Sequence, residues 1–437
     1  MKFGLLPKGY LDLAKVMGGT LTRNLLRGVV KLLIPLYLAP RALGVLRSVY
    51  SFFKILATAA DFGLDYAMVT LASAAMKKKE DTDADKLLKT VLTIKLLTAS
   101  TLLIVGNLLA PRLAAWALSD PELTVYVRVI FVALGGQLIW RFISSYLTTR
   151  QEFGRLALYL TTVPFLMLAS AGGLMLAGRF TLPAAILIYL LAPTVTVILW
   201  WPAVDRSFLR APGQGGGVGA RILRFSRWVY LSDVASSFRG HINPLLLKNP
   251  ALSGSVAAGE ANAGLYGFGN DLADEITIFS QSLVTVLLPK ASRKTTGPAL
   301  RGFVKQSYRH LLLVMIPLAL LLFVARPFLE ILGSLNAAYL AYLPSLKIFA
   351  ILYTGALFTV ASIPMRTALY SMNLPMVETV LDVITVPLMI GAGIMLIRSH
   401  GGEGAAMAVL AQRAVSCVAL TTIGLVKLRT YNPQPDA

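Results

Sequence analysis

Residues 183–204 of this chain read PAAILIYLLAPTVTVILWWPAV, an apolar block that contains no charged side chain. A helix of about twenty such residues crosses the hydrocarbon core of a bilayer, which is about 30 Å thick. Twelve blocks of comparable length follow one another along the 437 residues. None shows the alternation over about ten residues that is typical of an outer-membrane barrel strand. The pattern therefore predicts an all-α polytopic membrane protein with about twelve transmembrane helices.

The overall composition agrees with this prediction. Hydrophobic residues make up 56% of the chain and charged residues only 14%, whereas soluble domains carry about 25% charged residues. The mean hydropathy is +0.69. A soluble fold of this size would have to leave much of that apolar surface in water, because too few polar residues are present to coat it. The expected spans are 14–39, 43–73, 87–110, 122–147, 154–177, 183–204, 225–248, 263–288, 307–325, 338–361, 374–397 and 403–426.

The loops between these spans alternate in charge. One set is strongly basic, as in the stretches 77–89 and 206–227, whereas each loop of the other set holds about one cation, such as Arg112 or Arg179. Cytoplasmic loops carry the excess of Lys and Arg, so we expect both termini to face the cytoplasm and the protein to lie in the inner membrane. These loops also account for the net charge of +20, so no nucleic-acid partner is expected.

A glycine-rich segment divides the spans into two sets of six. The sequence predicts an N-terminal six-helix bundle at 1–210, a cytoplasmic linker at 211–224 and a C-terminal six-helix bundle at 225–437. Arg27-Gly28 in the first span and Arg239-Gly240 in the seventh lie at the same depth. This similarity favours an internal repeat of the two six-helix halves, which is a common arrangement in transporters.

Several charges fall inside the predicted spans, where each costs about 2.5–3.5 kcal/mol at a helix centre. Arg23, Arg27 and Lys31 recur every four residues, so they share one face of the first helix. Three cations with few acids nearby favour a cationic groove that binds an anion, above all phosphate, since Arg offers a planar fork of donors. The acids allow two interpretations, either partners that hold helices together or sites that couple transport to an ion. These acids are Asp61, Asp65, Asp271, Asp274 and Glu275.

Sequence features of an enzyme are missing. No phosphate-binding G-x-x-x-x-G-K-[ST] motif occurs, the three histidines have no second ligand at metal spacing, and Cys417 is the single cysteine. No loop between the spans exceeds roughly twenty residues, which leaves little room for a catalytic domain. We therefore expect no enzymatic activity, no cofactor and no metal site.

Four segments resemble the polysaccharide (O-antigen-type) flippases of the multidrug/oligosaccharidyl-lipid/polysaccharide (MOP) exporter superfamily. They are the opening GGTLTRNLLRGVVKLLIPLYLAPRALGVLRSVYSFFKILATAADFGLDYAM, the turn SSYLTTRQEFGRLALYL, the helix AGLYGFGNDLADEITIFSQSLVTVLLPKAS and the segment GGEGAAMAVLAQ. The resemblance runs over nearly the whole chain, and the order of the segments carries it. It implies two six-helix bundles in a V around a central cavity.

The same resemblance implies a function. Such a flippase would move an oligosaccharide linked to an undecaprenyl-pyrophosphate type of lipid across the cytoplasmic membrane by alternating access, for O-antigen, exopolysaccharide or capsule biosynthesis. A polysaccharide polymerase and glycosyltransferases would be its partners. The residues at positions where the family places cations for the pyrophosphate are Arg23, Arg27, Lys31, Lys54 and Arg239.

Other functions remain open at this point. The chief alternative is a cation-coupled multidrug or organic-cation antiporter of the same superfamily, which would need an acidic cavity. A peptidoglycan-precursor flippase, a membrane scaffold and a lipid-transferring enzyme are less well matched.

Overall fold

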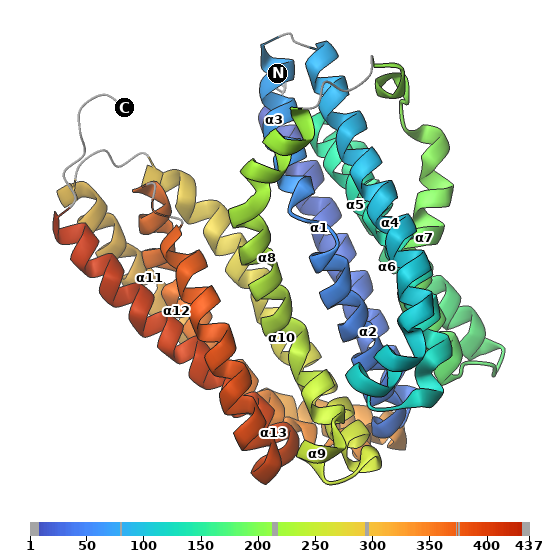
Figure 1. Cartoon of the computed structure of the whole chain (residues 1–437). Coiled ribbons are helices and arrows are strands. Elements are labelled where there is room, and N and C mark those ends of the chain that lie inside the picture. Colours follow the sequence, from blue (N-terminus) through green and yellow to red (C-terminus); the bar gives the residue numbers. More distant parts are fainter. Residues whose placement is uncertain are drawn as a thin grey trace, which may run out of the picture. The chain divides into compact units, whose positions relative to one another are not determined.

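The computed structural model describes residues 8–78, 81–211, 217–292, 297–372, 374 and 376–430. Within these ranges the chain forms α-helices and short 3-10 helices and no strands, so the predicted all-α class is confirmed (Figure 1). The α-helices are α1 (Lys8–Leu33), α2 (Pro40–Ala59), α3 (Leu64–Lys77), α4 (Asp81–Ala117), α5 (Thr124–Thr149), α6 (Phe153–Leu176), α7 (Leu182–Trp200), α8 (Val218–Lys248), α9 (Pro250–Ser253), α10 (Val256–Ser292), α11 (Gly297–Leu335), α12 (Ser345–Ser371) and α13 (Met376–Thr430).

These helices supply the twelve expected spans. Eight of them are long and apolar enough to cross a membrane by length and composition alone. One of the eight, α13, consists of two helices that meet at Gly401, where φ is 53° and ψ is −127°. The spans that this criterion omits are α1, α8 and α10, which carry intramembrane charges such as Arg27, Arg239 and Asp271. The prediction of about twelve transmembrane helices is confirmed.

The second span differs from the prediction. We expected one helix over 43–73, but α2 ends at Ala59 and α3 begins at Leu64. Phe62 and Gly63 between them have φ angles of 52° and 67°, in the left-handed region that ends a helix. A Cβ on Gly63 would lie 3.0 Å from the carbonyl oxygen of Ser226 on α8. Tertiary packing therefore fixes this break, and the apolar periodicity of the segment does not reveal it.

The chain forms two compact units. The first comprises 1–38 and 48–237, and the second comprises 39–47 and 238–437. The α2 and α8 helices each contribute to both units, because the divisions fall after Arg47 and after Ser237. The predicted bundle boundaries around 211–224, and the V-shaped placement of the bundles, stay predictions.

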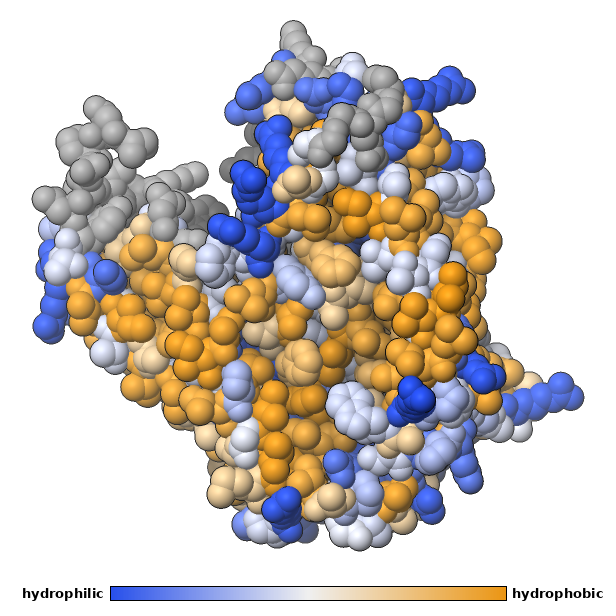
Figure 2. All heavy atoms as spheres, viewed as in Figure 1, coloured by the Kyte–Doolittle hydropathy of each residue, from blue (hydrophilic) through white to orange (hydrophobic). Residues whose placement is uncertain are grey.

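Each unit has its own apolar core and an apolar outer surface. In the first unit the core gathers Leu64, Leu88 and Phe142 from α3, α4 and α5. In the second unit α10, α12 and α13 supply a core that includes Leu352 and Val409. Large apolar side chains are also exposed on the outside. Figure 2 shows them covering the middle of the visible face of the first unit. Such a surface is stable in lipid and not in water.

The α5 and α7 helices approach closely at Gly136. A Cβ added there would lie 2.0 Å from Oγ1 of Thr194 and 2.8 Å from its Cα, so we expect Gly136→Ala to force the helices apart. The free energy of unfolding in detergent should fall by about 1–3 kcal/mol. Gly173→Ala on α6 is the matched control, since a Cβ there meets nothing within 4 Å. Equal thermal unfolding midpoints for the two variants would contradict the close approach.

Candidate functional site

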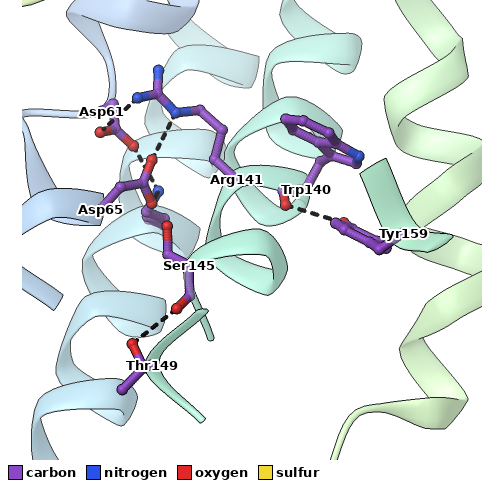
Figure 3. Close-up of polar contacts among 8 residues, drawn as sticks. Asp61, Asp65, Trp140, Arg141, Ser145, Thr149 and Tyr159 are labelled. Atoms are coloured by element: carbon purple, nitrogen blue, oxygen red, sulfur yellow. Dashed lines mark hydrogen bonds and ion pairs between the residues drawn. The ribbon is translucent and has the colours of Figure 1, made fainter. Parts of the chain in front are cut away.

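Four charged side chains form a buried cluster in the first unit. Asp61 lies in the break between α2 and α3, Asp65 in the first turn of α3, Lys95 on α4 and Arg141 on α5. The Lys95 Nζ atom is 2.6 Å from Oδ1 of Asp61 and 2.7 Å from Oδ1 of Asp65. The Arg141 Nε atom donates to Oδ2 of Asp65 over 2.6 Å (Figure 3). Two cations and two carboxylates thus balance one another.

The burial of this cluster explains its arrangement. The side chain of Lys95 is 0% exposed and that of Asp61 is 1% exposed. A charge so far from water is tolerated when it is paired and hydrogen-bonded. The four residues therefore tie the start of α3 to α4 and α5, and Asp61 and Asp65 are partners of cations in this structure.

Sequence reasoning missed Lys95. It lies inside the apolar run TVLTIKLLTAS, six residues beyond Lys89, and it resembled the end of the basic loop that precedes it. A signal was available, because Lys95 follows several apolar residues of a span that begins near residue 87. The buried pair of Lys248 and Glu260 in the second unit was missed as well. There the wholly buried Lys248 Nζ atom lies 3.3 Å from Oε1 of Glu260.

The cations predicted to bind phosphate on α1 lie in the first unit. Arg23 and Lys31 are half-buried, whereas Arg27 is exposed. The Nε atom of Arg23 is buried and has no hydrogen-bond partner in the part of the chain that the structure describes. A buried donor of this kind is stabilised when an acceptor, and most of all an anion, reaches it. The α1 helix packs against α6, which holds this row of cations in place.

Lys54 on α2 is the fourth predicted cation of this unit. Its side chain is half-buried, and its Nζ atom lies 5.9 Å from the centre of the Tyr50 ring. A cation above an aromatic face is attracted by the ring without being neutralised. Lys54 therefore keeps its charge for a further partner.

In the second unit Arg239 pairs with Asp382. Arg239 is on α8 and Asp382 is on α13, and the guanidinium donates to the carboxylate. A phosphate at Arg239 would have to share or displace that carboxylate. Arg366 and Glu378 form a neighbouring pair at 2.7 Å between α12 and α13, so charge is largely balanced at this end of α13.

The acids predicted on α10 have different surroundings. Asp271 accepts a hydrogen bond from Arg47, which lies two turns into α2 and within the second unit. Asp274 accepts from Asn270 over 2.9 Å, and Glu275 is exposed. No group of three or more His, Cys, Asp or Glu suited to a metal ion occurs among the described residues.

Comparisons with known proteins identify the family of this chain. Residues 14–294 match the sequence model of the family described as "Polysaccharide biosynthesis protein". No curated protein sequence matches the chain at a significant level.

Solved structures of other proteins share the fold. An inward-facing multidrug resistance MATE family transporter of the MOP superfamily is 15% identical, with a TM-score of 0.72 over 92% of this chain and 98% of that one. The lipid II flippase MurJ in an inward closed conformation is 14% identical, with a TM-score of 0.62 over 90% of each chain. A MOP superfamily transporter from Pyrococcus furiosus is 16% identical, with a TM-score of 0.56 over 96% and 94%. The chain therefore belongs to the polysaccharide biosynthesis protein family, and it has the fold of the MOP superfamily transporters.

Proposed function

We propose that this protein is a flippase that translocates a polyprenyl-pyrophosphate-linked oligosaccharide across the cytoplasmic membrane by alternating access. The membership of the polysaccharide biosynthesis family and the fold shared with a lipid II flippase support a membrane transporter of this general kind. The more specific part of the proposal is that the substrate is a lipid-linked oligosaccharide. Arg23, Arg27 and Lys31 would bind its pyrophosphate together with Lys54 and Arg239.

The observation that carries the proposal is the row of cations on α1. The helix contains one acid, Asp12, which lies about three turns before Arg23. The buried Nε atom of Arg23 has no acceptor among the described residues. An anionic head group could supply the acceptor that this atom lacks, because groups inside a span are stable when they are paired or hydrogen-bonded. A pyrophosphate offers several acceptor oxygens to guanidinium donors.

The alternative is a cation-coupled multidrug or organic-cation antiporter, and the MATE family fold gives it a specific basis. Such a transporter needs carboxylates that can receive an organic cation. Asp61, Asp65, Asp271 and Asp382 already contact Lys or Arg side chains. The flippase is therefore the better supported function.

The driving force would come from an ion gradient, the membrane potential or the concentration of the substrate. Glycosyltransferases would supply the substrate, and a polymerase would use it on the other side. The acids that could couple transport to protons or Na⁺ are Asp61, Asp65, Asp271, Asp274 and Glu275.

Neutralising two of the proposed phosphate ligands should release the lipid-linked glycan. The test variant combines Arg27→Gln with Arg239→Gln and Asp382→Asn, so that no carboxylate is left without its partner. Native mass spectrometry of protein purified in mild detergent should show the retained polyprenyl-pyrophosphate glycan reduced by about tenfold or more, because each charge-assisted contact contributes about 1.5–3 kcal/mol.

The matched control is Lys427→Gln with Arg429→Gln, which removes two exposed cations at the end of α13. It should retain the glycan at the level of the unmodified protein. Undiminished glycan on the test variant would refute the assignment of these ligands. Binding of organic cations in place of any glycan would favour the antiporter.

The buried cluster of the first unit should depend on charge balance. Lys95→Met leaves Asp61 and Asp65 with Arg141 alone, so the free energy of unfolding should fall by about 3–5 kcal/mol. Adding Asp61→Asn removes the excess negative charge, so it should restore part of the lost free energy of unfolding. Thermal unfolding in detergent measures both effects. A double variant less stable than Lys95→Met would show that packing around Lys95 matters more than charge.

Labelling from one side of the membrane tests the predicted topology. Cys417→Ala gives a cysteine-free background, into which Lys78→Cys or Arg179→Cys is introduced at exposed loop positions. An impermeant thiol reagent added to right-side-out membranes should modify position 179, since the basic loop at 78 is expected in the cytoplasm. In inverted membranes the reagent should instead modify position 78. Labelling of position 78 in right-side-out membranes and of position 179 in inverted membranes would overturn the topology.

A further inference from the structure

A cavity of about 560 Å³ lies between α10 and α11 in the second unit. Its volume is within the range of about 300–1,000 Å³ that small-molecule sites occupy. It is far along the sequence from the cations proposed to bind pyrophosphate, and no step of the proposed transport uses it. The side chains that decide its character are Leu283 and Leu287 on α10, and Gln306, Ser307, His310 and Val314 on α11.

Along α11 the cavity is polar in its middle, between Ala299, Gly302 and Phe303 on one side and apolar residues on the other. Gln306, Ser307 and His310 line it before the long apolar stretch of the helix begins, and Leu311 and Val314 line it at the start of that stretch. Leu312 and Leu313, which follow, are 65% and 67% exposed, as expected for side chains that face lipid. The cavity thus lies where α11 passes from the membrane interface into the hydrocarbon.

Three cations flank the cavity. Arg301, Lys305 and Arg309 recur every four residues on α11, and all three are exposed. Each lies one residue before a cavity-lining residue, so the cations form a row along one edge of the cavity. From 276 to 329 the sequence contains seven Lys or Arg residues and no Asp or Glu. No acid of this stretch can therefore neutralise the row.

We propose that this cavity binds an anionic glycerophospholipid of the surrounding bilayer. Its phosphate would contact Arg301, Lys305 and Arg309, and an acyl chain would enter between α10 and α11 beside Leu283 and Leu287. Two independent features point to this occupant. The cavity supplies an apolar wall that includes Leu283, Leu287 and Leu311, and the row of cations supplies an attraction to anionic lipid that a zwitterionic lipid lacks. In the topology predicted from the loop charges, this end of α11 faces the cytoplasmic leaflet.

A general attraction of basic loops for anionic lipid would not need a cavity, so the test separates charge from shape. One variant combines Arg301→Gln, Lys305→Gln and Arg309→Gln. Its matched control combines Arg221→Gln, Arg224→Gln and Arg227→Gln, three exposed cations on α8. A second variant, Gly302→Leu, fills the cavity, since a Cβ on Gly302 meets nothing within 4 Å. Its control is Gly391→Leu on α13, where a Cβ also meets nothing within that distance.

The measurement is native mass spectrometry after delipidation and addition of phosphatidylglycerol or phosphatidylethanolamine at matched concentrations. The unmodified protein should retain phosphatidylglycerol over phosphatidylethanolamine by about tenfold, as expected for a few Lys and Arg near an anionic head group. The triple Arg301 variant and Gly302→Leu should each lose that preference, and both controls should keep it. Unchanged elution and unfolding midpoints would show that the variants fold.

Three results would overturn the proposal. One is an equal loss of preference in the Arg221 control, which would indicate a general effect of positive charge. Another is full retention of phosphatidylglycerol by Gly302→Leu, which would show that the cavity is not the site. The third is displacement of phosphatidylglycerol by an equimolar polyprenyl phosphate, which would make the occupant an isoprenoid lipid. None of these results bears on glycan retention by the Arg27 and Arg239 variants, so the two proposals fail separately.

Discussion

The cost of placing charge in hydrocarbon governs the interior of both units. The Lys95 ammonium has no exposure to water, and it is stable there because Asp61 and Asp65 each accept a hydrogen bond from it. Arg141 completes the balance from α5. These contacts join three helices at the break between α2 and α3. The position of that break therefore follows from charge pairing as well as from the conformations of Phe62 and Gly63.

The same constraint identifies where charge is left over. In the second unit Arg41 and Lys248 share Glu260, and Arg239 pairs with Asp382. On α1 the row through Arg23 contains no acid. Cations within a span usually face a water-filled cavity or pair with acids or backbone carbonyls of other segments. The proposed role of α1 in binding therefore rests on the buried Nε atom of Arg23, which has no hydrogen-bond partner among the described residues.

The sequence predicted what depends on local composition. The apolar blocks gave the helices of both units, and the four-residue spacing placed Arg23, Arg27 and Lys31 on one face. Local sequence patterns could not predict contacts between segments that are far apart in the chain. Lys95 and Asp61 are 34 residues apart, and Arg239 and Asp382 are 143 apart, so their pairing depends on how the helices pack. The break at residues 60–63 was missed for the same reason, because Ser226 and Tyr230 on α8 surround Gly63.

Irregular backbone within a membrane-spanning region is itself informative. Backbone groups freed from a helix cannot face lipid, so they must be satisfied by protein or by water. At the break after α2, the carbonyl oxygen of Ala59 accepts a hydrogen bond from the hydroxyl of Tyr230 over 3.1 Å, and Asp61 joins the buried cluster. Transporters place substrate and ion sites where helices are interrupted in this way. The first unit thus combines an interrupted helix, a group of paired buried charges and a buried Arg23 Nε atom without a hydrogen-bond partner among the described residues, whereas a purely structural bundle would require none of them.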